Sequence, residues 1–385
     1  MERETGWQSA RVVPLAALAF ACAYGVLAAE PAKAGSALAG DGSSIDSSAS
    51  AMKRDRDADG IDDDEESALA EAFAPVVLHA SDDPSLPTNV DAFLENTQMH
   101  FFDAGCDPEV SEVDPAPRSE GLGAHRYVSK CLPGEQFRSD GTRSEFKQHS
   151  FFLADVDVPH RRGSEDTREW TTYFHAYRND AGGVTVQYWF FYPYNTGKSF
   201  ELFGRTLVFG HGGDWEGVHV VLDPAHRPVL LRLLGHRDIT EIAWERACLD
   251  GSHPILSSAC GSHTSEIAVA DGVSRIRQET WSGGKVSWPG GRSTPAGALV
   301  NLGEKTRPLR PFLAYSGLWG SVGFNLHRAL PGLDVQNFTS GYWGPAYNET
   351  GMRADGFITA WCAGIADETK TGNGVRECFP HATTD

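Results

Sequence analysis

Short runs of β-branched and aromatic residues, separated by Gly, Pro, Asn and Asp, dominate the hydrophobic pattern of this chain. Such runs with turn residues between them are typical of β-strands. We expect strands at 76–78, 151–158, 171–177, 184–192, 217–222, 229–234 and 267–269. Helical periodicity is nearly absent, apart from a short helix expected over 66–73. The pattern therefore predicts an all-β fold, namely an antiparallel β-sandwich with long decorated loops and a short N-terminal helix.

The stretch 188–221 is the one around which the rest of the chain is organised. It opens with an unbroken aromatic run, 188–192, which fits a central strand covered on both faces. The residues 179–183 before it predict a hairpin turn. Strand alternation places Asp214 and Glu216 on one face. Because an unpaired ionised carboxylate is costly to bury, we expect both acids at the rim of the sandwich.

The N-terminal composition predicts export. An apolar run, 12–29, follows Arg11 and ends in small residues, so 1–29 is expected to be a secretory signal peptide, with a retained anchor as the alternative. Residues 30–52 are rich in Ala, Ser and Gly and predict a flexible linker. No second linker follows, so 67–385 is expected to form one large β-sandwich domain. The mature protein should be secreted or extracytoplasmic.

The net charge limits the possible binding partners, and the cysteine count predicts disulfides. The net charge of −19 argues against binding nucleic acid, and against docking on anionic lipid without a bridging cation. Cleavage of the signal peptide removes one of the seven cysteines, Cys22, and the even number left implies disulfides in an exported chain. Many pairings are open, but sequence neighbours would close short loops. We therefore expect Cys106–Cys131, Cys248–Cys260 and Cys362–Cys378.

An acidic segment, 53–66, has the pattern of a calcium-binding loop. Carboxylates occupy loop positions 1, 3, 5, 9 and 12, and a glycine occupies position 6. Calcium favours several oxygen ligands, a sharp turn and a final bidentate carboxylate. The candidate ligands are Asp55, Asp57, Asp59, Asp63 and Glu66. The position of Ile61 makes the loop resemble a thrombospondin type 3 or dockerin-like repeat more than an EF-hand. An acidic disordered run is the alternative.

Residues 210–216, Gly-His-Gly-Gly-Asp-Trp-Glu, carry a resemblance to a known family. They are similar to the heptapeptide Gly-His-x-x-Asp-Trp-Glu of the necrosis- and ethylene-inducing-peptide-like proteins, which are secreted cytolysins. The chain from about 67 to 350 more closely resembles the vacuolar protein sorting-associated protein 62 family. The segments that carry this second resemblance are 69–77, 86–94, 188–193, 261–263, 316–320 and 341–345. It implies a fold more than an activity.

The cytolysin resemblance implies a divalent-cation site. It assigns His211, Asp214 and Glu216 as ligands and places Asn195 where the family has an upstream Asp. An amide offers only a neutral oxygen, so the cation would be held more weakly. This chain also has a glycine, Gly213, in place of the second His of the heptapeptide.

A histidine further along the chain, His263, is a candidate catalytic residue or ligand. It is flanked by small polar residues, which suits a general base, a ligand or a satisfied structural histidine. If it faces His211, Asp214 and Glu216, the cluster could activate water for hydrolysis.

Our leading hypothesis is a secreted, calcium-assisted β-sandwich that binds a membrane-lipid headgroup or a glycan and acts like a toxin. Trp319 and Trp343 are candidate binding residues, because tryptophans among glycines can present flat rings; close packing of buried indoles is the alternative. The expected cofactor is a divalent cation, with calcium preferred. The alternatives are a secreted metal-dependent hydrolase and a purely structural calcium-stabilised domain. The distance from His263 to the carboxylates of Asp214 and Glu216 discriminates between them.

Overall fold

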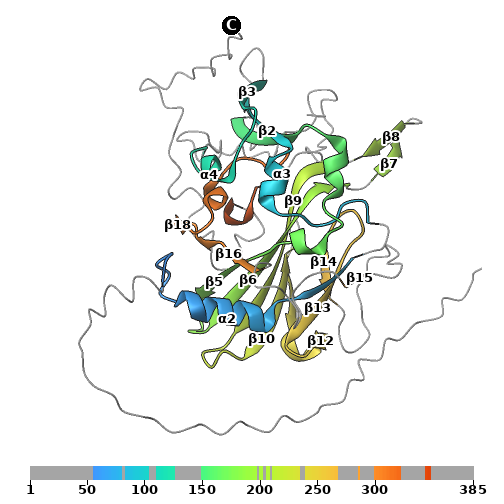
Figure 1. Ribbon diagram of the computed structural model, residues 1–385. Coiled ribbons are helices and arrows are strands. Elements are labelled where there is room, and N and C mark those ends of the chain that lie inside the picture. The colour runs from blue at the N-terminus through green and yellow to red at the C-terminus, as the bar shows by residue number, and fades with distance from the viewer. Residues whose placement is uncertain are drawn as a thin grey trace, which may run out of the picture.

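The computed structural model describes residues 55–79, 83–103, 110–125, 149–196, 199–202, 205–208, 210–234, 239–267, 285–286, 299–321 and 343–347 (Figure 1). The expected signal peptide and linker lie outside these residues, as do all the cysteines except Cys248 and Cys260. Within the described ranges, no helix is both long enough and apolar enough to cross a membrane.

A six-stranded sheet forms the centre of the fold. Its strand order is β11–β10–β9–β6–β5–β16. The strands are β5 (Thr172–Arg178), β6 (Val184–Asn195), β9 (His211–Leu222), β10 (Pro228–Leu234), β11 (Ile239–Ala243) and β16 (Leu299–Asn301). The turn between β5 and β6 is the predicted one, because Asn179 Oδ1 accepts hydrogen bonds from the backbone N–H groups of Ala181 and Gly183.

A second sheet and a helix cover one face of this central sheet (Figure 1). The helix is α2 (Asp63–Phe73), and the strands are β1 (Val76–His79), β12 (Leu249–Asp250), β13 (His253–Ser258), β14 (Ser265–Ile267) and β15 (Lys285–Val286). The core between the layers joins Leu69 and Phe73 of α2 to Val77 and Leu256 of the second sheet, and to Val218 of β9. The short N-terminal helix and the sandwich are therefore as expected.

The opposite face of the central sheet is covered by smaller elements. They are α3 (Val90–Leu94), α4 (Ser119–Leu122), η6 (Pro311–Ala314) and a three-stranded sheet of β2 (Thr97–Asp103), β3 (Val110–Asp114) and β4 (His149–Asp155). Trp189 and Phe191 of β6 belong to this core, whereas Tyr188, Phe190 and Tyr192 belong to the first. The aromatic run thus lies on a central strand buried on both faces, which confirms the prediction.

The structure differs from the predicted strand pattern in three places. Strand β9 begins at His211 and not at residue 217, β4 ends at Asp155, and two pairings, β1 with β13 and β16 with β5, are parallel.

The remaining elements are η3 (Val158–Arg162), η4 (Thr167–Glu169), β7 (Ser199–Leu202), β8 (Arg205–Val208), η5 (Trp244–Arg246), β17 (Gly303–Glu304), β18 (Arg307–Pro308) and η7 (Pro345–Tyr347). Figure 1 shows the β7–β8 hairpin projecting from the body of the fold.

The predicted Cys248–Cys260 disulfide is wrong, because a strand separates the two residues. The Cys248 carbonyl accepts a hydrogen bond from Ile255 N–H, in the middle of β13. Cys260 lies in the turn after that strand, and the three strand residues after Ile255 alone carry the chain roughly 10 Å beyond it. A disulfide requires two Cα atoms within about 7 Å. The other two predicted pairs lie outside the described residues.

Gly213 allows β9 to lie directly against the chain around Trp319. Its φ is +60°, and an added Cβ would lie 1.8 Å from the Trp319 carbonyl oxygen. A residue with a side chain would be strained at this φ, and its Cβ would clash with the rigid main chain of Trp319. The contact therefore requires glycine.

Substituting Gly213→Ala tests this contact, with Gly182→Ala as the matched control. Gly182 also has a positive φ, +79°, but its nearest prospective neighbour is Pro224 Cγ at 3.9 Å. We expect Gly182→Ala to lower the free energy of unfolding by about 1–2 kcal/mol from backbone strain alone. Gly213→Ala should cost about 1–3 kcal/mol more, measured by urea denaturation. Equal losses in the two variants would contradict the close approach.

Candidate functional site

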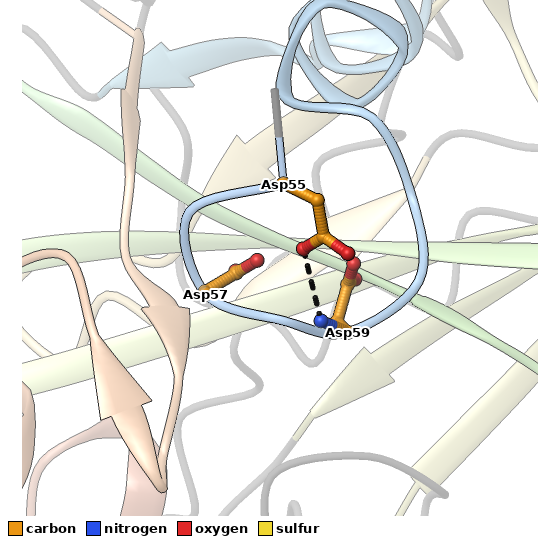
Figure 2. A group of neighbouring side chains, drawn as sticks. All are labelled: Asp55, Asp57 and Asp59. Atoms are coloured by element: carbon orange, nitrogen blue, oxygen red, sulfur yellow. Dashed lines mark hydrogen bonds between the residues drawn. The ribbon is translucent and has the colours of Figure 1, made fainter. Parts of the chain in front are cut away.

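The predicted acidic loop is a compact turn that gathers its carboxylates. Ala58 and Gly60 adopt positive φ values of 62° and 88°. The Asp55 carboxylate accepts hydrogen bonds from the backbone N–H groups of Asp59 and Gly60, each at 3.2 Å. Figure 2 shows the side chains of Asp55, Asp57 and Asp59 directed into the loop. Ligand-type oxygens lie within 4.8 Å of one another in two groups, Asp55–Asp57–Asp59 and Asp57–Asp63–Glu66.

Several of these oxygens are buried without a hydrogen-bond partner. Asp57 is only 2% exposed, and neither of its carboxylate oxygens has a partner. Glu66 is fully buried; its Oε2 accepts a hydrogen bond from Asn301 Nδ2 at 2.8 Å, while its Oε1 has none. Asp59 Oδ2 is also buried without a hydrogen-bond partner. Because buried polar atoms are normally satisfied, these oxygens are suited to an electropositive partner.

The electrostatics of the loop support the same conclusion. Burial, followed by the charges of Asp57 and Asp59, raises the pKa of Glu66 to about 9. Burial also raises the pKa of Asp59 to about 6 and shifts that of Asp57 upward. Binding of a cation to these acids would therefore displace protons. A set of hard oxygen donors fits a divalent metal ion, so this loop is a candidate metal centre.

The loop is anchored to the central sheet from both sides. Ile61 lies in the core between the layers. Arg178 at the end of β5 donates a hydrogen bond to the Gly60 carbonyl at 3.1 Å, and Asn301 of β16 holds Glu66. The acidic segment is thus packed into the fold.

A second polar cluster forms where β6 and β9 pair. Tyr192 lies opposite Asp214, and Asn195 lies opposite His211. Asn195 Nδ2 donates to Asp214 Oδ2 at 3.1 Å, and His211 Nε2 is 3.8 Å from Asp214 Oδ1. Three of the four residues of the predicted cation site are therefore in mutual contact around Asp214. Among the described residues, however, groups of three ligand-type atoms within 4.8 Å occur only in the acidic loop.

His263 completes this cluster. Its Nδ1 lies 2.8 Å from Asp214 Oδ2 and its Nε2 lies 3.5 Å from Asp83 Oδ1. The imidazole stacks on the Tyr192 ring, with 3.9 Å between ring centroids. The proximity of His263 to Asp214 that the hydrolase alternative requires is therefore present.

Burial opposes a charge on His263, but the hydrogen bonds and charges of Asp214 and Asp83 outweigh it and raise its pKa to about 9. A protonated imidazole between two carboxylates has no lone pair for a proton. At neutral pH the residue is therefore suited to holding the cluster together and not to general-base catalysis.

The expectation that Asp214 and Glu216 lie at the rim needs correction. They are 1% and 4% exposed. Burial, then the Asp214 charge, raises the pKa of Glu216 well above its ordinary range, so burial favours the neutral form of this acid. Asp214 is compensated by the His263 cation. The predicted strand alternation holds, since Val218 and Val220 follow on the same face in the first core.

Sequence reasoning missed Asp83, which closes the cluster from a distant segment. Its Oδ1 also accepts hydrogen bonds from the N–H groups of Ser85 and Gly261. Strands β1 and β13 are parallel, so the residues following each strand emerge at the same edge. Asp83 and His263 meet there. Only knowledge of that pairing would have revealed the contact.

The structure places Trp319 and Trp343 in the interior, which corrects the expectation of exposed binding rings. They are 0% and 4% exposed and belong to the core beside α3. An added Cβ at Gly344 would lie 2.5 Å from Trp319 Nε1. The surrounding glycines therefore serve close packing of the indoles.

Comparison with known proteins gives only slight likenesses. No protein-family model matches the chain, and no curated protein matches it. A solved structure described as "Toxin fold as basis for microbial attack and plant defense" is 16% identical, with a TM-score of 0.29 over 61% of this chain and 73% of that chain. "NLPPya in complex with glucosamine" is 15% identical, with a TM-score of 0.29 over 64% and 75%. Overlap at this level does not assign a function, which must come from the residues.

The Asp83–His263–Asp214 cluster predicts a stability change at alkaline pH. The folded pKa of His263, about 9, lies above its ordinary value of 6.5, so its contribution is complete below pH 6.5 and is lost as pH rises through 9. Wild type should lose a few kcal/mol of unfolding free energy across this window. Two other titratable groups face the ring, and neither titrates in this pH window. Burial raises the pKa of Tyr192 well above its ordinary value and lowers the pKa of His79 to about 3.

Urea denaturation between pH 6 and pH 10 measures this loss. His263→Gln should start less stable and show a flatter profile. His160→Gln, a half-exposed control, should follow wild type. Parallel profiles for wild type and His263→Gln would refute the ion cluster.

Proposed function

We propose that this protein is an exported, calcium-dependent β-sandwich that acts by binding a target. The observation that carries the proposal is the set of buried, unpartnered oxygens of Asp57, Asp59 and Glu66. They converge in a loop whose basic residue, Arg56, pairs with Asp63 and leaves these oxygens without a cation. A bound cation would remove the cost of burying them.

The ligand chemistry supports calcium over smaller divalent ions. Calcium accepts many carboxylate oxygens in a flexible arrangement, whereas magnesium requires a near-octahedral shell and keeps several waters. Five carboxylates with a final Glu66 fit the calcium pattern. Calcium would connect the loop at Asp55–Asp59 to α2 through Asp63 and Glu66, and to β16 through Asn301.

The target proposed for this module is a lipid headgroup or a glycan outside the cell, reached by a toxin-like surface. The signal-peptide pattern and the heptapeptide resemblance at 210–216 support this assignment. The metal-dependent hydrolase is less well supported. His263 is near Asp214, but both of its ring nitrogens face carboxylates.

Calcium titration of the full chain tests the proposal. Wild type should bind calcium in isothermal titration and melt several degrees higher at saturation, because a ligand at about 100 times its Kd adds about 2.7 kcal/mol. Asp57→Asn should lose most of both effects, since Asp57 belongs to both ligand groups. Asp64→Asn makes the same charge change at an exposed residue outside these groups and should behave as wild type. Identical calcium responses in the two variants would argue against the site.

Proton release offers an independent check. Because burial among acids raises the pKa of Glu66 to about 9, this carboxyl is protonated near pH 7 without a cation and must lose its proton when calcium binds. Apparent calcium affinity should therefore rise from pH 6 to pH 9. At pH 7 the binding heat should vary linearly with the ionisation enthalpy of the buffer. The slope should correspond to about one proton released per calcium bound to Glu66. A binding heat independent of buffer would contradict ligation by protonated Glu66.

A further inference from the structure

The five candidate ligands of the acidic loop form two groups and not one. The first group consists of Asp55, Asp57 and Asp59, and the second of Asp57, Asp63 and Glu66. Within each group the ligand atoms lie within 4.8 Å of one another, and among the described residues no such group contains all five acids. Calcium holds its oxygen ligands at about 2.3–2.6 Å, so two ligands of one ion are at most about 5 Å apart. Each group therefore has the width of one calcium coordination sphere.

Asp57 belongs to both groups and has two oxygens to offer. Its side chain is directed into the loop (Figure 2) and is 2% exposed. Both of its carboxylate oxygens are buried without a hydrogen-bond partner. Because each oxygen of a carboxylate can bind a different metal ion, Asp57 is placed to bridge two cations.

Each group also has an unpartnered oxygen of its own. These are Asp59 Oδ2 in the first group and Glu66 Oε1 in the second. The other oxygen of each carboxylate is already bonded, since Asp59 Oδ1 accepts from Ile61 N–H at 2.6 Å and Glu66 Oε2 accepts from Asn301 Nδ2 at 2.8 Å. These bonds orient the two carboxylates. A cation in one group would therefore leave the unpartnered oxygen of the other group without a partner.

The charge of the loop also matches two divalent ions. The five carboxylates carry five negative charges, and Arg56, which pairs with Asp63, compensates one of them. Two divalent cations would balance the remaining four. A single one would leave two negative charges beside Asp57 and Glu66, which are 2% and 0% exposed. Uncompensated charge is costly at such buried positions.

We propose that the acidic loop binds two divalent cations, with Asp57 as the bridging ligand between them. The first cation lies between Asp55 and Asp59 and closes the turn. The second lies between Asp63 and Glu66 and ties the turn to α2. Oxygen-only ligands favour calcium at both positions, and metal ions in two-metal sites lie about 3.5–4 Å apart. The inference rests on the proposed calcium-dependent function and adds a second ion to it.

The number of bound ions tests this inference on the full chain. After equilibrium dialysis against saturating calcium, in about 0.15 M KCl to screen exposed acids, we expect about two calcium ions per wild-type chain. Asp55→Asn removes a ligand of the first group alone, and Asp63→Asn removes one of the second alone, so each should lower the number by about half. Asp57→Asn should lose nearly all bound calcium. The control Asp64→Asn changes an exposed acid outside both groups and should bind as wild type does.

Energy transfer between bound lanthanide ions measures how close the two positions are, and in the wild type it does not depend on how the variants fold. Both positions are filled with equal amounts of terbium and neodymium. About half of the bound terbium ions should then have a neodymium neighbour at about 4 Å, and their emission lifetime should be shortened. Asp55→Asn, which retains only the second group, should give an unchanged lifetime.

The outcomes separate this inference from the proposed function. One calcium ion per wild-type chain would overturn the second ion and leave the proposed function standing, whereas no bound calcium would count against the proposed function itself. Equal numbers of bound calcium ions in wild type and in Asp55→Asn would exclude the assigned ligands. An unchanged terbium lifetime in the wild type would show that the ions do not share Asp57.

Discussion

The central sheet is buried on both faces, so any charge carried by its strands or by the elements packed on it must be compensated inside the protein. This constraint accounts for the chemistry of both polar clusters. Apolar side chains supply the cohesion on each face, and they also remove the water that would otherwise solvate an acid. The free-energy cost of burying a carboxylate is met differently at Asp214 and at Glu66. The first belongs to an internally neutralised cluster, and the second to a candidate metal site.

At Asp214 the protein supplies its own cation. The His263 imidazolium lies between Asp214 and Asp83, and burial raises the pKa of Glu216 well above its ordinary range, so the cluster has its own compensation for its acids. Among the described residues, no cation contacts Glu66. Arg56 pairs with Asp63 and Asn301 donates a hydrogen bond to Glu66, but both oxygens of Asp57 and one oxygen each of Asp59 and Glu66 remain unsatisfied. The two clusters contain similar residues, but only the second retains an unmet requirement for positive charge.

The sequence predicted features that depend on local spacing. The alternation along 188–192 assigned its aromatic rings to two faces, the turn at 179–183 formed as expected, and the acidic loop gathered the five predicted side chains. Contacts that depend on which strands pair could not be predicted from the sequence. The meeting of Asp83 with His263 depends on β1 running parallel to β13. Cys248 and Cys260 are close in sequence, yet the straight path of β13 keeps them apart. The rim position expected for Asp214 failed because its compensating cation comes from a distant segment.

The bond between Asn301 and Glu66 has a consequence for the order in which the chain acquires its structure. These residues are 235 positions apart in the sequence. An emerging polypeptide therefore presents all five acids of the loop long before the strand that orients the last of them exists. Until β16 joins β5, the proposed ligand set is incomplete, and the entropy of closing so long a connection has not yet been met. The oxygen cluster proposed to hold calcium therefore exists only in the finished fold, after most of the protein has assembled.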